Sequence, residues 1–395
     1  MNLPLENIKV LDLTRVLAGP YCTMILADLG AEVIKVERPY TGDDSRAFGP
    51  YVENESMYFI SINRNKKSIT VNLKSDKGKD IIKELVKKVD IVVENFKPGT
   101  MERLGLGYDT LKSVNEKIIY AGLSGFGHYG PYSSRPAYDG VVQAMGGIMS
   151  ITGQEGGEPT RVGSSIGDIF AGIFGAIGIL SAINKRKVDR LGMKVDVSML
   201  DCQVAVLENA ISRYFATGKS PVPMGNKHSS VVPFEPFSTK DGKIMIAVGN
   251  DNLWLKFCTS INREDLKKDG RFKTNLLRYN NYDYLRPIIQ KELIKKTTKE
   301  WEKILINEGI PSAPINNIEM LVNNEQVIAR KMIQQIKHPK AGRVSIPGVP
   351  IKISGCSDDI RFSAPVLGQH TEEILKEYLS ISSDNLEIMR KEEVI

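Results

Sequence analysis

The sequence has few residues of the types that bind metals or form disulfides. Its four cysteines, Cys22, Cys202, Cys258 and Cys356, are far apart and form no Cys-x-x-Cys motif. Its four histidines lack the spacing of metal ligands, so no metal site is expected. The cysteine usage predicts reduced thiols and a cytoplasmic location.

Three further patterns are missing. No arginine-rich block, zinc-finger spacing or basic helix occurs, so nucleic acid is not an expected partner. The residues after Met1 show no signal-peptide pattern, and the longest apolar run, Ile169–Ile183, is too short and too rich in glycine for a membrane span. No Gly-x-Gly-x-x-Gly follows the first expected strand, which disfavours an ordinary dinucleotide site.

The composition favours a large globular protein. Its 395 residues are 42% hydrophobic, enough for a large domain and a smaller one. The formal net charge of +6 comes from scattered lysines, a pattern typical of a solvated surface that also suits an anionic small-molecule ligand.

The first half of the chain alternates strands and helices. Lys9–Leu13, a helix over Tyr21–Leu29 and Glu32–Val36 form a strand–helix–strand unit, which predicts a parallel sheet. Further strands are expected at Lys67–Leu73, Asp90–Glu94, Lys117–Leu123 and Met193–Val197. The predicted fold class is therefore α/β, with a doubly wound parallel sheet.

The composition of the sequence changes after the helix expected over Met199–Thr217. A linker rich in Pro, Gly, Ser and Asn follows, and then a hairpin with an Asp241-Gly242 turn opens a smaller α+β domain. The expected boundaries are a large domain over 1–217, a linker over 218–232, a small domain over 233–318, a linker over 319–335 and a C-terminal part over 336–395.

Three segments that follow strands carry ligand-binding chemistry. They are Arg38, the loop Asn95–Gly99 and the loop Ser124–Pro131. The carboxyl ends of parallel strands meet at one edge of a sheet, where ligands bind. An Arg, an Asn, glycine backbones and the rings of Phe96 and Phe126 can hold a nucleotide with phosphates there.

Asp168 stands alone before a long apolar stretch. Gly172, Gly175 and Gly178 recur after it, so a helix here has a bare face that another element can approach closely. Near the start of such a helix, Asp168 meets unpaired N–H groups and the positive end of the dipole, which favour its ionised form. Two interpretations stay open at this point, an ordinary N-cap and a catalytic carboxylate.

The order of several segments resembles the class III CoA-transferase family (CaiB/BaiF type), which includes formyl-CoA transferase and the carnitine CoA-transferases. The resemblance covers nearly the whole chain. It is carried by Leu5–Thr14, Ala18–Pro20, Leu29–Pro39, Asn65–Ile69, Val92–Gly99, Ser124–Gly127, Gly167-Asp168 and Leu367–Thr371.

The resemblance implies an architecture as well as an activity. It implies a Rossmann-like large domain built from both chain ends, so that 336–395 returns to it, with the small domain inserted between. It also implies a homodimer of two interlocked rings. CoA thioesters are the substrates, and no tightly bound cofactor is implied.

The resemblance makes Asp168 the nucleophile. Its carboxylate attacks an acyl-CoA, and CoA passes to a small carboxylic acid through a mixed anhydride and an aspartyl-CoA thioester. An ordinary aspartate pKa of about 3.9 would leave it ionised without a general base. The resemblance places CoA at the carboxyl edge of the sheet, in contact with Val16, Leu17, Arg38, Asn72, Leu73, Asn95, Phe96, Gly99, Met101, Arg103 and Tyr138.

Two departures from the family bear on the substrate. Gly225–Phe234 lacks the glycine run that closes over the intermediate in formyl-CoA transferase, which disfavours formyl or oxalate specificity. The acyl-CoA racemases of the family carry Gly-His-Asp where this chain has Ala137-Tyr138-Asp139, which favours transfer over α-epimerisation. A racemase, a non-catalytic CoA-binding protein and an NAD dehydrogenase are the alternative interpretations.

Overall fold

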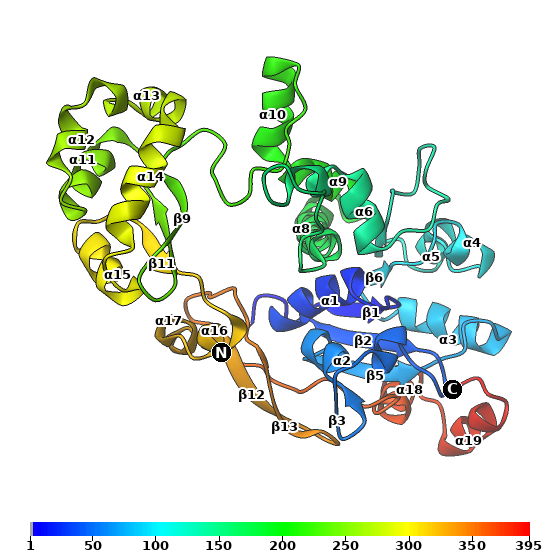
Figure 1. Cartoon of the computed structure of the whole chain (residues 1–395). Helices are drawn as coiled ribbons and strands as arrows, with labels where there is room; N and C mark the ends of the chain where they lie inside the picture. The colour runs from blue at the N-terminus through cyan, green and yellow to red at the C-terminus, as the bar shows by residue number, and fades with distance from the viewer. Residues whose placement is uncertain (1–2) are drawn as a thin grey trace. The chain divides into compact units, whose positions relative to one another are not determined.

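The computed structural model describes residues 3–395, which divide into two compact units (Figure 1). The first unit comprises the chain up to Met149 together with Arg161–Gly218 and Glu325–Ile395. The second comprises Ser150–Thr160 and Lys219–Asn324. Both ends of the chain therefore contribute to the first unit.

A six-stranded parallel sheet forms the centre of the first unit. Its order is β5-β2-β1-β6-β7-β8, so the direction of winding reverses between β1 and β6. This is the strand order of a doubly wound nucleotide-binding sheet, and it confirms the prediction of a central parallel sheet. The strands are β1 Lys9–Asp12, β2 Glu32–Glu37, β5 Lys66–Thr70, β6 Ile91–Glu94, β7 Ile119–Ser124 and β8 Lys194–Ser198.

Helices cover both faces of this sheet, and its inner strands β6 and β7 are accordingly rich in apolar residues. One face buries residues such as Val10 and Ala121 under α1 and α8. The other face buries Leu11 and Val92 under α3 and the C-terminal helices. The helices of this unit are α1 Ala18–Asp28, α2 Met57–Ile62, α3 Asp76–Val86, α4 Thr100–Arg103, α5 Tyr108–Val114, α6 Asp139–Met145, α8 Ile166–Asp189, α9 Met199–Val206, α10 Glu208–Thr217, α17 Glu325–Ala329, α18 Thr371–Leu379 and α19 Ser383–Lys391.

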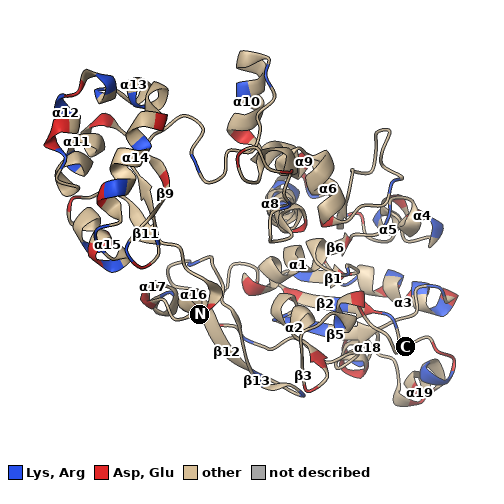
Figure 2. Cartoon of the chain, in the orientation of Figure 1, with Lys and Arg blue, Asp and Glu red and all other residues tan. Residues whose placement is uncertain are grey.

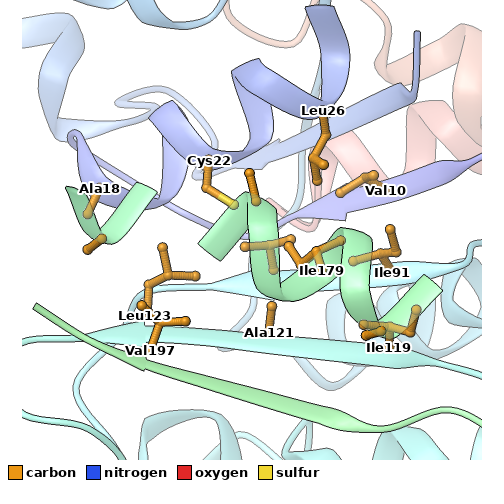
Figure 3. Packing of buried hydrophobic residues seen from close by; sticks show 14 of the residues in the cluster. Val10, Ala18, Cys22, Leu26, Ile91, Ile119, Ala121, Leu123, Ile179 and Val197 are labelled. Atoms are coloured by element: carbon orange, nitrogen blue, oxygen red, sulfur yellow. The ribbon is translucent and has the colours of Figure 1, made fainter. Parts of the chain in front are cut away.

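The glycines of α8 allow the close approach that the sequence predicts. A Cβ at Gly172 would lie 2.9 Å from the carbonyl oxygen of Ala18 in α1. At Gly175 it would lie 3.0 Å from Leu123 and 3.1 Å from the sulfur of Cys22, and at Gly178 it would lie 2.8 Å from Val195. Figure 3 shows this packing, with α8 between α1 and the strands β6 and β7. The bare face is confirmed as a contact surface for both a helix and the sheet.

Within residues 3–395, α8 is the one helix long and apolar enough to cross a membrane by length and composition. Of its most apolar window, 44% is buried inside the structure. Its glycine face packs on α1, β7 and β8, which is the environment of a core helix.

The C-terminal segment of the first unit is hydrogen-bonded to the edge strand β5. The N–H of His370 donates to the carbonyl of Ser68 at 2.8 Å, and the N–H of Thr70 donates to the hydroxyl of Thr371 at 2.9 Å. A hairpin of β12 Ile333–His338 and β13 Gly342–Pro347 packs on α2. Smaller elements are η1 Asp44–Ala47, β3 Tyr51–Val52, β4 Glu55–Ser56 and α7 Ile148–Ile151, which spans the unit boundary.

The prediction of one continuous helix over Met199–Thr217 is wrong. Met199–Thr217 forms two helices, α9 and α10, because the chain changes direction where Glu208 adopts a φ of +30°. None of the residues of α10 is buried in this chain.

The second unit has its own core of aromatic and aliphatic residues, including Trp254, Phe257 and Trp301. Its antiparallel sheet has the order β11-β10-β9, and the predicted hairpin turns through Asp241-Gly242. Figure 2 shows Lys and Arg interspersed with Asp and Glu on the helices of both units. The elements are β9 Phe234–Ser238, β10 Lys243–Ala247, α11 Asp251–Ser260, α12 Glu264–Lys268, η2 Gly270–Phe272, α13 Asn275–Asn280, α14 Tyr282–Leu293, α15 Thr298–Asn307, β11 Ser312–Pro314 and α16 Ile318–Val322.

We expect Gly172→Ala to lower the free energy of unfolding by about 1 kcal/mol. Alanine gains ~1 kcal/mol of helix propensity, but the overpacking against the Ala18 carbonyl costs about 1–3 kcal/mol. Gly140→Ala in α6 is the matched control, because a Cβ there meets nothing within 4 Å. Urea unfolding of the three proteins tests this, and equal stability of the two variants would contradict the packing argument.

Candidate active site

The loops after β1 and β6 meet at the point where the sheet reverses its winding. The side chain of Asn95 accepts from the N–H of Arg15 at 2.9 Å and donates to the carbonyl of Arg15 at 2.8 Å. This two-way contact fixes one loop against the other. In open α/β sheets the crevice at this point is where ligands bind.

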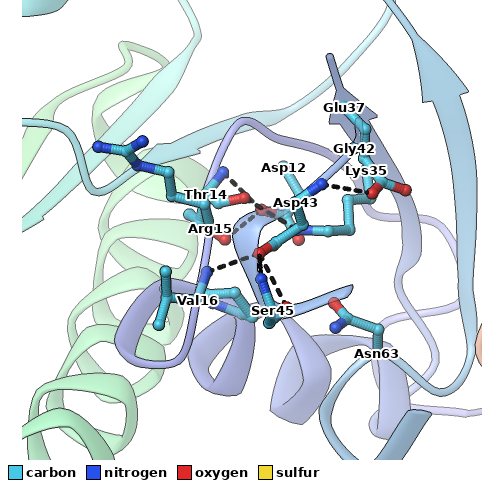
Figure 4. A network of polar contacts seen from close by, with 12 residues as sticks. Asp12, Thr14, Arg15, Val16, Lys35, Glu37, Gly42, Asp43, Ser45 and Asn63 are labelled. Atoms are coloured by element: carbon cyan, nitrogen blue, oxygen red, sulfur yellow. Dashed lines mark hydrogen bonds and ion pairs between the residues drawn. The ribbon is translucent and has the colours of Figure 1, made fainter. Parts of the chain in front are cut away.

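A buried polar network holds the loop after β1 in place (Figure 4). The ammonium of Lys35 in β2 donates to the carbonyl of Thr14 at 2.8 Å and lies 2.8 Å from the carboxylate of Asp43. Asp43 also accepts from the N–H of Val16 at 3.0 Å, where the chain adopts a φ of +67°. The network therefore stabilises a left-handed residue that the isolated chain would disfavour.

Asp12, at the end of β1, is the second carboxylate of this network. It is fully buried and accepts from the backbone and hydroxyl of Thr14, from Thr23, and from Lys66 at 3.1 Å. Burial alone would raise the pKa of Asp12, but Lys66 and Lys35 outweigh it and hold that pKa below its usual value. Burial lowers the pKa of Lys66 to about 8. The start of α1 is thus tied to β1 and β5.

A cavity of about 480 Å³ opens at this edge of the sheet. Four residues that the resemblance assigned to CoA line it: Arg38, Asn72, Leu73 and Phe96. The other lining residues are Leu13, Thr14, Arg15, Val36, Glu37, Pro39, Tyr40, Thr41, Gly42, Asp43, Val71, Lys74, Thr100, Leu104 and Glu393.

Three cations line this cavity. Arg15 and Arg38 both pair with the carboxylate of Asp44, and both side chains are half-exposed. The guanidinium of Arg15 lies 5.6 Å from the centre of the Phe96 ring. Lys74 has no ion pair within residues 3–395. The cavity therefore combines an aromatic face with positive charge, as an anionic nucleotide requires.

The remaining residues assigned to CoA do not line the cavity. Asn95 connects the two loops, Val16 is bonded to Asp43, and Leu17 is buried against Met24 and Ile62. Gly99 precedes α4 with a φ of +84°, Met101 is buried, and Arg103 bonds to the hydroxyl of Thr100. Tyr138 is 77% exposed and immediately precedes α6.

Asp168 is the third residue of α8, and Ser165 occupies the N-cap position. The interpretation of Asp168 as an N-cap is therefore wrong. Its carboxylate is half-buried and makes no hydrogen bond or ion pair within residues 3–395. An acidic side chain in the first turn still faces the positive end of the helix dipole.

A second carboxylate, that of Asp139 at the start of α6, contacts the first turn of α8. One oxygen accepts from the N–H of Gly167 in the first turn of α8 at 2.9 Å. The other accepts from Gln143 at 2.8 Å and lies 3.3 Å from Nε of Arg161. Asp139 thus anchors the start of α8 and supplies one of its orphan N–H groups with an acceptor.

Burial raises the pKa of Asp168 to about 7, and the negative charge of Asp139 adds to the increase. This corrects the expectation that Asp168 keeps an ordinary pKa. Burial also raises the pKa of Tyr58 to about 12, and the negative charges of Asp168, Asp43 and Asp139 add to this increase. The phenol of Tyr58 therefore lies within the electrostatic field of these carboxylates.

Sequence reasoning missed Asp139, Tyr58, Arg15 and Lys74. For Asp139 a signal was available, because Ala137-Tyr138-Asp139 stands where the racemases of the family carry Gly-His-Asp, so Asp139 matches the aspartate of that segment. For Lys74 only its place next to Leu73 pointed to the cavity. No group of three or more His, Cys, Asp or Glu in residues 3–395 is arranged to hold a metal ion.

The chain is similar to known proteins over nearly its whole length. The model for CoA-transferase family III matches residues 5–371, so the chain belongs to this family of CoA-transferases. It is 40% identical over 385 residues to succinyl-CoA:glutarate CoA-transferase of Mus musculus, covering 97% of this chain and 88% of that protein. It is 42% identical over 377 residues to acetyl-CoA:oxalate CoA-transferase of Acetobacter aceti, covering 95% and 96%.

A solved structure agrees with the fold. A CaiB/BaiF family protein from Brucella suis superposes with a TM-score of 0.85 at 37% sequence identity, covering 96% of this chain and 100% of that one. The family resemblance of the sequence is thereby confirmed.

We expect the Asp168 carboxyl to titrate near pH 7 rather than near 4. Asp139→Asn removes the neighbouring charge while keeping an acceptor for Gly167, so the midpoint moves to lower pH. Asp201→Asn, at the third position of α9 and exposed, leaves it unchanged. Carbon NMR of labelled aspartate, assigned with Asp168→Asn, measures the midpoint, and an ordinary aspartate value would refute the burial effect.

Proposed function

We propose that this CoA-transferase moves CoA from an acyl-CoA to a carboxylic acid by covalent catalysis at Asp168. The observation that carries the proposal is a half-buried carboxylate in the first turn of a helix that has no hydrogen-bond or ion-pair partner within residues 3–395. A structural carboxylate in such a place is normally hydrogen-bonded. An unpartnered one suits attack on a carbonyl carbon.

The proposed route keeps the energy of the thioester in four steps. The carboxylate of Asp168 attacks the acyl-CoA carbonyl, which gives a mixed anhydride and CoA thiolate. The thiolate attacks the aspartyl carbonyl and expels the donor acid, leaving an aspartyl-CoA thioester. The acceptor carboxylate attacks this thioester, and the released thiolate then attacks the acceptor acyl group, which regenerates Asp168.

Residues around Asp168 support these steps. Backbone N–H groups of the first turn of α8 can stabilise the oxyanions that develop on the aspartyl carbonyl. Asp139 fixes that turn through Gly167. The attacking form is the carboxylate, so the raised pKa of Asp168 predicts a rate that increases with pH through about 7.

We also propose that the cavity at the switch point holds the nucleotide of CoA. Phe96 offers a ring face, and Arg38, Arg15 and Lys74 offer positive charge to the phosphates. Asn95 holds the loop after β6 against the loop after β1. Val16, Leu17, Gly99, Met101, Arg103 and Tyr138 keep their assignment as CoA contacts within this proposal.

For the substrates we propose a dicarboxylic donor and acceptor, such as succinyl-CoA and glutarate. Several relatives at 34–41% identity are named for succinyl-CoA with glutarate, mesaconate or citramalate. The half-exposed guanidinium of Arg161, in contact with Asp139, supplies a cation near the start of α8 for a second carboxylate.

The homodimer of interlocked rings is likewise a proposal. It is supported by apolar residues that this chain leaves exposed, such as Ile177 on α8 and Phe215 on α10, which is 80% exposed. We expect sedimentation to give the mass of two chains. A stable monomer at micromolar concentration would contradict the dimer while leaving the chemistry of Asp168 open to the next test.

The test of the chemistry is to trap the acylated aspartate. Incubation with succinyl-CoA and then hydroxylamine is expected to convert an aspartyl thioester at Asp168 into a hydroxamate, which peptide mass spectrometry detects. Asp168→Asn is expected to abolish the modification and to lower transfer to glutarate by at least about a thousandfold.

Asp201→Asn is the control, because Asp201 occupies the same position in α9. It is expected to leave both trapping and transfer unchanged. An unmodified Asp168 with every donor tested, together with exchange of the α-proton of the same CoA esters into solvent, would favour the racemase alternative instead.

A further inference from the structure

Glu94, the last residue of β6, carries a buried carboxylate directly beneath the loop Asn95–Gly99. Its side chain is 2% exposed. One oxygen accepts from the N–H of Phe96 at 2.8 Å, and the other accepts from the hydroxyl of Tyr120 in β7 at 3.1 Å. The hydrogen bond to Phe96 fixes the residue whose ring lines the cavity.

His128, in the loop after β7, faces the same carboxylate. Its Nδ1 lies 3.0 Å from the ammonium of Lys194, which can only donate, so Nδ1 is an acceptor. In the neutral ring the proton is therefore on Nε2. That nitrogen is buried without a hydrogen-bond partner in residues 3–395 and lies 3.5 Å from Oε1 of Glu94.

The close approach of Glu94 and His128 depends on Gly122 in β7. A Cβ at Gly122 would lie 2.4 Å from Nε2 of His128 and 3.0 Å from Oε1 of Glu94. The backbone N–H of His128 is held by the carboxylate of Asp196 in β8 at 3.0 Å. The imidazole is thus held over the carboxylate by β7 on one side and β8 on the other.

Burial and the surrounding charges together bring the pKa of Glu94 close to neutral pH. Burial raises the pKa of Glu94 to about 7, the bonds from Phe96 and Tyr120 oppose this, Glu102 in α4 adds to it, and Lys194 lowers it. Burial and the charge of Lys194 lower the pKa of His128, while Asp196 and Glu102 act the other way. A neutral His128 and a titrating Glu94 therefore coexist at neutral pH.

We propose that Glu94 and His128 form a proton switch for nucleotide binding, in which ionised Glu94 holds the Asn95–Gly99 loop in place and protonated Glu94 releases it. Ionised Glu94 is acceptor-only: it accepts from the Phe96 N–H and the Tyr120 hydroxyl, and Nε2–H of His128 lies 3.5 Å away. Protonation places a donor on one of the two oxygens: on Oε2 it opposes the Phe96 N–H, and on Oε1 it opposes Nε2–H of His128, whereas the Tyr120 hydroxyl can reverse and accept. The bond to Phe96 also loses its charge assistance.

Glu94 is a positioning residue in this proposal, because it acts through Phe96 and Asn95 rather than on the ligand. The inference rests on the proposed function, since it requires the cavity to hold the nucleotide. It predicts that affinity for the nucleotide falls as pH decreases through about 7, while the chemistry at Asp168 is not involved in the binding measurement.

The experiment measures the Kd of 3′-dephospho-CoA by calorimetry from pH 6 to 8 on the full chain. This ligand lacks the phosphate monoester that itself titrates near neutral pH. We expect the Kd to increase about fivefold from pH 8 to pH 6 in the unaltered protein. Glu94→Gln, which keeps the shape and an acceptor, is expected to show a Kd that is independent of pH.

A shift of the midpoint distinguishes a proton switch from a structural role. Lys194→Met removes an exposed charge that lowers the pKa of Glu94, and it frees Nδ1 of His128 for the other tautomer, so the midpoint is expected to move to higher pH. Lys117→Met removes an exposed charge at the amino end of β7, and its midpoint is expected to stay unchanged.

The outcomes separate the two proposals. A Kd that is equal at pH 6 and pH 8 in the unaltered protein, or a pH dependence that persists in Glu94→Gln, would overturn the switch while leaving the nucleotide site intact. Failure to bind either CoA or 3′-dephospho-CoA at any pH would overturn the proposed nucleotide site, and the switch with it.

Discussion

The ion pair between Lys35 and Asp43 is the interaction on which the edge of the sheet depends. Both side chains are buried, and together they bind the backbone of Thr14 and Val16. A buried pair of this kind contributes little net stability, because desolvation offsets most of the attraction. Its effect is geometric: it holds the loop after β1 in one conformation, and Asn95 then holds the loop after β6 against it.

Four buried or half-buried carboxylates in this unit show that partners, and not burial alone, decide protonation. Asp12 and Asp43 have buried lysines beside them, so their pKa values fall. Among the described residues 3–395, no Lys or Arg contacts Asp168 or Glu94 directly, so burial raises the pKa of each to about 7. The first pair is structural for that reason. The second pair can change protonation state near neutral pH, which suits groups with a chemical or binding role.

The central sheet could be predicted from the sequence because short apolar runs, such as Ile91–Val93 in β6 and Ile119–Leu123 in β7, alternate with stretches of helical periodicity. The close packing of α8 could be predicted too, since three glycines at Gly172, Gly175 and Gly178 leave one face bare. The raised pKa of Asp168 could not, because it arises from burial and from Asp139, a residue far enough along the chain that only the fold brings it to the first turn of α8. The break at Glu208 was missed for a similar reason, because no helix-breaking residue marks it. The roles assigned to Asp168 and the CoA contacts, and the domain boundaries, stay predictions.

The raised pKa of Asp168 has a consequence for the proposed route that an ordinary aspartate would not have. In the mixed anhydride, CoA thiolate can attack either carbonyl. Attack on the substrate acyl carbon expels Asp168 and reverses the first step, whereas attack on the aspartyl carbon expels the donor acid and moves the reaction forward. The less basic carboxylate is the better leaving group, and ordinary carboxylic acids have a pKa of about 4. A nucleophile with a pKa near 7 therefore biases collapse of the anhydride toward the aspartyl-CoA thioester, and it is also the more reactive carboxylate in the first attack. Burial beside Asp139 therefore favours the first two steps, but it opposes the last step, in which the thiolate must expel Asp168 from the acceptor anhydride, and it leaves the nucleophile only partly ionised at neutral pH.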